Sequence, residues 1–230
     1  MFPYPKILFC LAIVLVSCGV ENRIVDRPIV FDDQRVALTK EYLKNRYLLE
    51  RDSVTITPQM IVLHHTVIPT LERTYRAFGP SALPSWRPEL ENVSGLNVSS
   101  QFVIDRDGTI YRLMPETYMA RHVIGLNHCA IGVENVGGTP EMPLTKPQVR
   151  ANAQLVKYLA KKYPIEYLIG HREYRLFEGH PLWLEVNVGY RTIKDDPNAE
   201  FMEAVRAKTK RCGFKALPVP EKSNSSTSEL

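Results

Sequence analysis

Four polar clusters in this chain carry side chains that can bind a metal ion or move a proton. They are His64 with its neighbour His65, then Glu134, then His171, and then the charged run Lys194-Asp195-Asp196. Histidine nitrogens and carboxylate oxygens are ligands that zinc takes in proteins, and three protein ligands leave a fourth position for water. A zinc ion with three such ligands and a bound water would favour hydrolysis. A single histidine at the end of a strand is, however, more often a hydrogen-bonded core or surface residue.

Glu134 is the most unusual of these residues. It interrupts the apolar run Ala-Ile-Gly-Val of residues 130–133 and comes shortly before Gly137-Gly138. A carboxylate in such a place is either solvated at an edge or held in a site. The residues alone leave both interpretations open.

Alternating strands and helices must position these clusters. Short apolar runs predict strands over 60–63, 101–105, 109–114, 130–136 and 165–169, and helical spacing predicts helices over 34–49, 70–78, 145–163 and 199–210. Asp107-Gly108 predicts a hairpin between the second and third strands. The alternation indicates one α/β domain, which we expect over 32–214. The four clusters lie at strand ends or in the loops after them, where open α/β sheets build their sites.

Composition is typical of a globular protein, with 44% hydrophobic and 23% charged residues and a formal net charge of +4. The basic residues are scattered and no nucleic-acid-binding motif is present, so we expect no nucleic-acid partner. We expect a monomer. Beyond the first eighteen residues the cysteines are Cys129 and Cys212, and the sequence leaves open whether they pair.

The first residues of the chain differ from the rest. Lys6 precedes an unbroken apolar run over 7–16, and small residues follow at Ser17 and Gly19, which is a secretory signal pattern. The run is shorter than the roughly 20 residues that span a bilayer as a helix.

Leu15-Val16-Ser17-Cys18 resembles the lipobox of bacterial lipoproteins. This resemblance implies cleavage before Cys18 and a lipid on its thiol; the alternative is an ordinary signal peptide or a short anchor with an incidental cysteine. We expect a signal peptide over 1–17, a tether over 18–31 and a disordered tail over 215–230. The expected location is the cell envelope, at the periplasmic face of the outer membrane.

Four blocks of sequence resemble one known family. They read Met60-Ile-Val-Leu-His-His-Thr66, Gln101-Phe-Val-Ile-Asp-Arg-Asp-Gly-Thr109, Ala120-Arg-His-Val-Ile-Gly-Leu-Asn-His-Cys-Ala-Ile-Gly-Val-Glu-Asn-Val-Gly-Gly138 and Leu168-Ile-Gly-His171. In this order they resemble the type 2 N-acetylmuramoyl-L-alanine amidases, which include phage amidase-type lysozymes, cytoplasmic anhydromuropeptide amidases and peptidoglycan recognition proteins. The resemblance implies a mixed, mostly parallel central sheet flanked by helices on both faces. It also implies one zinc ion and cleavage of the amide between N-acetylmuramic acid and L-alanine in peptidoglycan or muropeptides. The alternative is a non-catalytic muropeptide-binding module of the same fold.

The resemblance also implies the zinc ligands. The first maps to His64, directly after an apolar strand, and the second to His171. The family's Cys-Pro or Asp-Pro pair is missing from the expected window, which reads Glu178-Gly-His-Pro181. Lys194-Asp-Asp-Pro197 resembles the Lys-x-Asp-Pro form of the cytoplasmic branch. We therefore expect Asp196 as the third ligand, with His180 as its competitor.

Further roles follow from the same resemblance. Glu134 falls where the cytoplasmic branch carries its catalytic glutamate, and Lys194 matches a lysine that stabilises the developing oxyanion. His122 and Asn127 are implied to bind substrate. For Lys194 and His122 the alternative is a solvated surface side chain.

Overall fold

The computed structural model describes residues 23–85 and 93–219. The expected signal peptide over 1–17, Cys18 and the residues 220–230 of the expected tail lie outside the described residues. No helix in the described ranges is long and apolar enough to cross a membrane.

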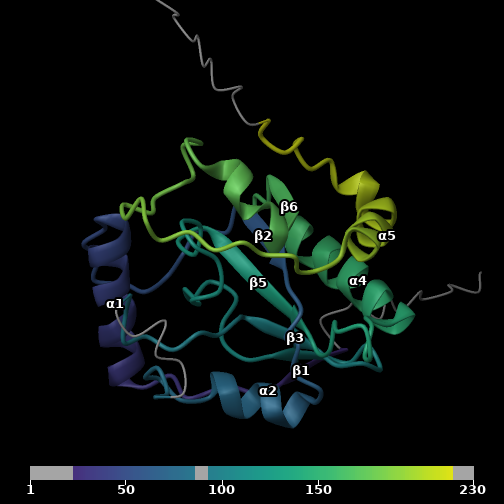
Figure 1. Ribbon diagram of the computed structural model, residues 1–230, viewed down its shortest axis with the longest axis horizontal. Helices are drawn as coiled ribbons and strands as arrows, with labels where there is room; N and C mark the ends of the chain where they lie inside the picture. Colours follow the sequence, from purple (N-terminus) through teal and green to yellow (C-terminus); the bar gives the residue numbers. More distant parts are fainter. Residues whose placement is uncertain (1–22, 86–92, 220–230) are drawn as a thin grey trace, which may run out of the picture.

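A six-stranded sheet forms the centre of the molecule (Figure 1). Its strands are β1 (Ile24–Asp26), β2 (Met60–Leu63), β3 (Phe102–Ile104), β4 (Ile110–Arg112), β5 (Ala130–Asn135) and β6 (Tyr167–Gly170). Their order is β1-β4-β3-β5-β2-β6. Strands β3, β5, β2 and β6 are parallel to one another, and the hairpin partner β4 is antiparallel to β3. The expected mixed, mostly parallel sheet is confirmed.

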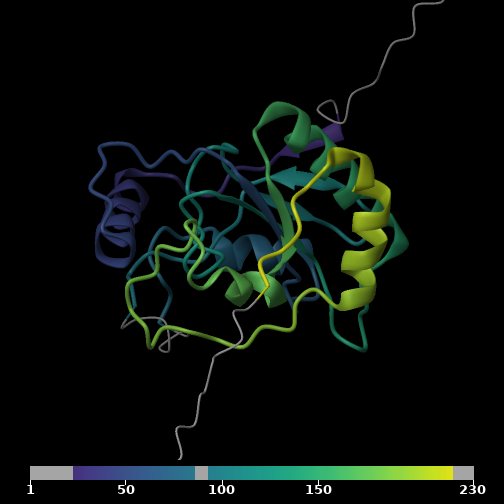
Figure 2. The ribbon, with the colours of Figure 1, turned by 90° about the horizontal axis from the view of Figure 1, so that it is seen from above.

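Helices cover both faces of this sheet. They are α1 (Asp33–Tyr47), α2 (Leu71–Phe78), α4 (Lys146–Lys162) and α5 (Ala199–Thr209), with short 3-10 helices η2 (His171–Phe177) and η3 (Lys210–Cys212). Figure 2 shows α1 and α5 at opposite ends of the molecule, with the sheet between them. The start of α4 follows its sequence signal, because Thr145 and Gln148 cap it reciprocally and Pro147 lies in its first turn.

Side-chain alternation divides the strands between two cores. Ile61 and Leu63 pack with α4 and α5 on one face. Met60 and Val62 pack on the other face with η2 and the loop before β5. All four residues of β2 have a relative exposure of 0%, which is typical of a parallel strand covered on both sides.

The expected tether over 18–31 is corrected in part. Within it, β1 pairs in parallel with β4, and Arg112 donates to Asp26 with an Nε–Oδ1 distance of 2.6 Å. Ile29 is buried. The partner strand makes this segment a strand, because three residues carry too little pattern to predict one.

At the other end of the fold, the expected disordered tail begins with packed residues. The Lys215 N–H donates to the Glu166 carbonyl at 2.8 Å, and Leu217 packs against the core beside β6. Cys129 is buried and Cys212 half-buried, and both are free thiols. Burial raises the pKa of Cys129 to about 12, so this thiol stays protonated.

Candidate metal site and cleft

The register of three parallel strands brings the first polar residues together. Leu63 of β2 pairs with Val133 on β5 and with Gly170 on β6. The next residues along these strands are His64, Glu134 and His171. Their side chains therefore lie side by side, near the carboxyl ends of three adjacent strands.

His64, His171 and Asp196 form a compact cluster at these strand ends. The Nδ1 atoms of His64 and His171 lie 3.4 Å and 3.2 Å from Oδ2 of Asp196. One ligand atom from each residue lies within 4.8 Å of the others, and all three residues are buried. Among the described residues this is the one group of three histidine, cysteine or carboxylate side chains close enough to share a metal ion.

The protonation states in this cluster suit a cation. Burial, together with the neighbouring His64, lowers the pKa of His171 to about 4, so its ring is neutral at pH 7. Burial alone would raise the pKa of Asp196, but the hydrogen bond from His171 and the close contact with His64 outweigh it and hold the pKa well below its ordinary value. An anionic carboxylate thus faces a neutral imidazole.

Asp196 reaches the cluster through backbone packing. Its carbonyl accepts from the Arg172 N–H at 2.7 Å, just after the end of β6. Gly170 gives the space, because a Cβ there would lie 3.2 Å from Pro197 and from Met202 of α5. An ion pair between Arg206 of α5 and Glu173 then ties α5 to η2.

His180, the competing third residue, lies elsewhere. Its Nε2 is 3.3 Å from the Tyr167 hydroxyl, and its Nδ1 accepts from the Leu182 N–H. Tyr167 begins β6 whereas His171 follows its end. The structure therefore brings Asp196, not His180, beside the two histidines.

A cleft of about 480 Å³ opens over this cluster. Glu134 and Lys194 both line it, together with His64, His171 and Asp196. Lys194 lines the cleft two residues before Asp196, and its positive charge contributes to the low pKa of His171. His65 also lines the cleft, and its ring packs over Gly138, where a Cβ would lie 2.3 Å from it.

His122 and Asn127 line the same cleft, but both have partners inside the protein. His122 Nδ1 lies 3.0 Å from His64 Nε2. Asn127 is fully buried, and its Oδ1 accepts from the N–H groups of His122 and Val123. Its Nδ2 donates to the Tyr42 hydroxyl at 3.3 Å. The structure thus gives Asn127 a role in holding its own loop.

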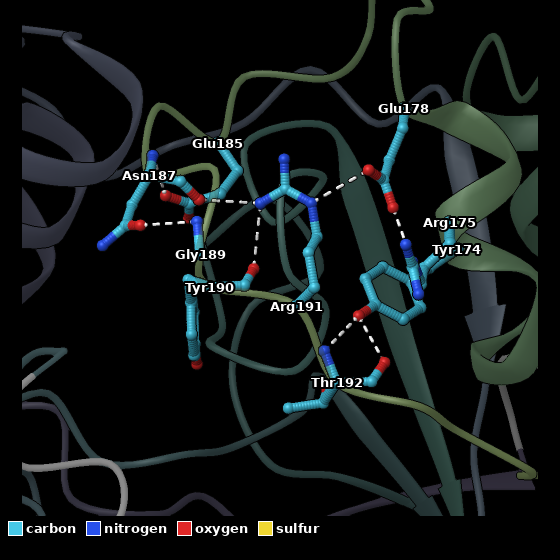
Figure 3. Close-up of polar contacts among 9 residues, drawn as sticks. All are labelled: Tyr174, Arg175, Glu178, Glu185, Asn187, Gly189, Tyr190, Arg191 and Thr192. Carbon is cyan, nitrogen blue, oxygen red and sulfur yellow. Dashed lines mark hydrogen bonds and ion pairs between the residues drawn. The ribbon is translucent and has the colours of Figure 1, made fainter.

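One side of the cleft is lined by Tyr190 and by residues 192–195, which belong to the longer segment 178–195. This segment extends toward α1 and returns across the sheet to α5 (Figure 1). Arg191 is its centre: Nε donates to Glu178 at 3.0 Å, and Nη1 donates to the carbonyls of Asn187 and Tyr190 at 2.8 and 3.0 Å (Figure 3). One guanidinium therefore fixes the fold of the segment.

Two further contacts attach the segment to the rest of the protein. The Tyr174 hydroxyl accepts from the Thr192 N–H and donates to the Thr192 carbonyl (Figure 3). Arg46 of α1 forms an ion pair with Glu185 at 2.7 Å, with the Glu185 side chain fully buried. These contacts set the position of Lys194 in the segment and of Asp196 directly after it.

Several cleft residues were not identified from the sequence. Tyr190 and Thr192 line the cleft from the segment 178–195, Tyr42 from α1 and Arg121 from the loop before β5. Arg121 directly precedes His122 in the sequence, but only the structure shows that its guanidinium is buried, with an exposure of 3%, which is uncommon for arginine. The tyrosines carried no signal, since similar aromatic residues fill the core.

Solved structures define the class of this fold. An N-acetylmuramoyl-L-alanine amidase, LysC from Clostridium intestinale URNW, aligns with a TM-score of 0.50 and 22% identity, covering 84% of this chain and 98% of that chain. A selenomethionine derivative of AmpD gives a TM-score of 0.51 and 18% identity over 83% and 94% of the chains. Peptidoglycan recognition protein-LE, in complex with tracheal cytotoxin, gives 0.50 and 16% over 84% and 96%. At these identities the likeness shows the fold, which is the one that amidases and peptidoglycan recognition proteins share.

The sequence match is more specific. The model of the N-acetylmuramoyl-L-alanine amidase family matches residues 54–197, more than half of the chain, and the chain belongs to this family. The match begins before β2 and ends directly after Asp196, so it contains every residue of the cluster. A search of curated protein sequences returned no match.

We expect Arg191→Leu to loosen the segment 178–195 without unfolding the domain. Loss of the charged hydrogen bonds should lower the local opening free energy by about 2 kcal/mol, so hydrogen exchange at the Gly189 and Tyr190 amides should become faster. The matched control is Arg175→Leu, because Arg175 binds the same Glu178 carboxylate from η2. Equal exchange in the two variants would contradict the central role of Arg191.

Proposed function

We propose that this protein is a zinc-dependent amidase that hydrolyses the amide bond between N-acetylmuramic acid and L-alanine in peptidoglycan or muropeptides. One observation carries the proposal: the ligand atoms of His64, His171 and Asp196 lie within 4.8 Å of one another under an open cleft. Membership of the N-acetylmuramoyl-L-alanine amidase family supports the choice of bond.

The donor set fits zinc. Two imidazole nitrogens and one carboxylate oxygen are a combination found at catalytic zinc sites, where the fourth position stays open. The cleft supplies that opening, and the ionised Asp196 would offset part of the charge of the ion. A zinc ion held there would lower the pKa of a bound water toward about 7 and polarise the scissile carbonyl.

Glu134 and Lys194 supply the remaining chemistry. Glu134 lies at the same level of the sheet as His64 and borders the cleft, so its carboxylate can accept a proton from the attacking water and return it to the leaving nitrogen. Lys194 borders the same cleft, and its ammonium group would stabilise negative charge on the carbonyl oxygen in the transition state.

We also propose that the protein is exported and held at the periplasmic face of the outer membrane by a lipid on Cys18. The support is the apolar run over 7–16 followed by Leu-Val-Ser-Cys. Cys18→Ser should release the protein from the membrane fraction and remove the mass of the lipid. Membrane retention at an unchanged mass would contradict the proposal.

Each residue of the cluster should be required for zinc binding. His64→Ala, His171→Ala and Asp196→Ala should lose both the zinc and the turnover of muropeptides, whereas wild type should hold one zinc per chain. His180→Ala is the control and should keep both. The measurements are metal content by mass spectrometry and release of stem peptide. A folded wild type without zinc would contradict the amidase and favour a muropeptide-binding module.

Glu134→Gln should separate binding from chemistry. Because the amide keeps the shape of the side chain but accepts no proton, turnover should fall by about 10²–10⁴-fold while zinc content stays at the wild-type level. Glu141→Gln is the control, since Glu141 is an exposed carboxylate that follows the same strand. Full activity in Glu134→Gln would exclude this residue as the general base.

A further inference from the structure

His64 has a different neighbour at each nitrogen of its ring. Asp196 lies 3.4 Å from Nδ1, and His122 Nδ1 lies 3.0 Å from Nε2. The two imidazole rings are nearly perpendicular, at 88°, with centroids 5.1 Å apart. His122 therefore contacts His64 on the side away from the cluster, as a hydrogen-bond partner.

The direction of this hydrogen bond follows from the contacts that His122 makes at the start of β5. Strand β3 pairs with β5 only from Val133 onward. On that side of β5, the backbone groups of the earlier residues therefore contact side chains and not a neighbouring strand. The Gly132 N–H donates to Gln101 Oε1 at 2.7 Å, and the Ala130 carbonyl lies 3.3 Å from His122 Nε2. A carbonyl oxygen only accepts. His122 must therefore carry its hydrogen on Nε2.

We propose that His122 is a positioning residue that fixes the tautomer of His64. With its hydrogen on Nε2, a neutral His122 offers a lone pair at Nδ1, so His64 must donate from its own Nε2. The hydrogen of His64 is then held away from Nδ1, the nitrogen that faces Asp196 and His171. The metal-binding part of this inference rests on the proposed zinc site, whereas the hydrogen-bond chain from His64 to Ala130 does not.

The surroundings of His122 support a fixed ring. Gly132 leaves space for it, because a Cβ there would lie 2.8 Å from His122 Cγ. Asn127 holds the backbone at His122 and is itself hydrogen-bonded to Tyr42 of α1. These contacts orient the ring toward His64 and leave its two nitrogens engaged inside the protein.

Zinc affinity tests the proposal. His122→Leu removes the acceptor and should weaken zinc binding by about 10–100-fold, as loss of an outer hydrogen-bond partner of a ligand does. His122→Asn places an oxygen near the position of Nδ1 and should restore most of the affinity. The control is His128→Phe on the same loop, whose ring packs edge-on against Tyr47. Affinity is measured by competition with a chelating dye, and thermal unfolding of the metal-free proteins checks their folding.

A second measurement needs no variant. In the zinc-loaded wild type, ¹⁵N spectra of the histidine side chains should show hydrogens on Nε2 of both His64 and His122. A hydrogen on Nδ1 of His122, or wild-type affinity in a folded His122→Leu, would overturn the proposal. A wild type that binds no zinc would instead overturn the proposed function, and the tautomers of the metal-free protein would still report on the chain to Ala130.

Discussion

The whole site depends on the parallel pairing of β2 with both β5 and β6. This register puts His64, Glu134 and His171 directly after the last paired row of three adjacent strands. A shift of one residue in either pairing would turn a side chain to the opposite face. The strands resist such a shift because they bury apolar side chains on both faces. Each misplaced side chain would add to the free energy that the shift requires.

The two faces of the sheet differ in chemistry. The face under α4 and α5 is mostly an apolar core, in which Asn135, Gln148 and Asn152 are buried with hydrogen bonds to one another and to the backbone. The other face buries the polar groups beside the cleft, which also need partners. Gln101 and His122 take the place of a missing strand beside β5, and the buried pair Arg46–Glu185 anchors the segment that leads to Asp196. The site lies on the face where each of these polar groups has a hydrogen bond or ion pair.

Much of the fold follows from local sequence. The branched apolar runs, the helical spacing and the caps predict β2 to β6 and the α-helices of the described residues, with every end placed to within two residues. Local pattern governs these elements because each has a strong period or a clear boundary, such as Thr145 before α4 or Asp107-Gly108 before β4. Strand β1 has neither, and its pairing with β4 defines it.

For the site, the sequence by itself determined the family, two histidines after strand ends and an Asp-Pro pair further along the chain. Tertiary structure decided that Asp196 and not His180 joins them, because backbone packing against Gly170 and Arg172 sets that position. It also decided that His122 lies against His64. The contact of that ring with His64 spans 58 residues of chain, and no local pattern carries the direction of a hydrogen bond between segments that meet only on folding.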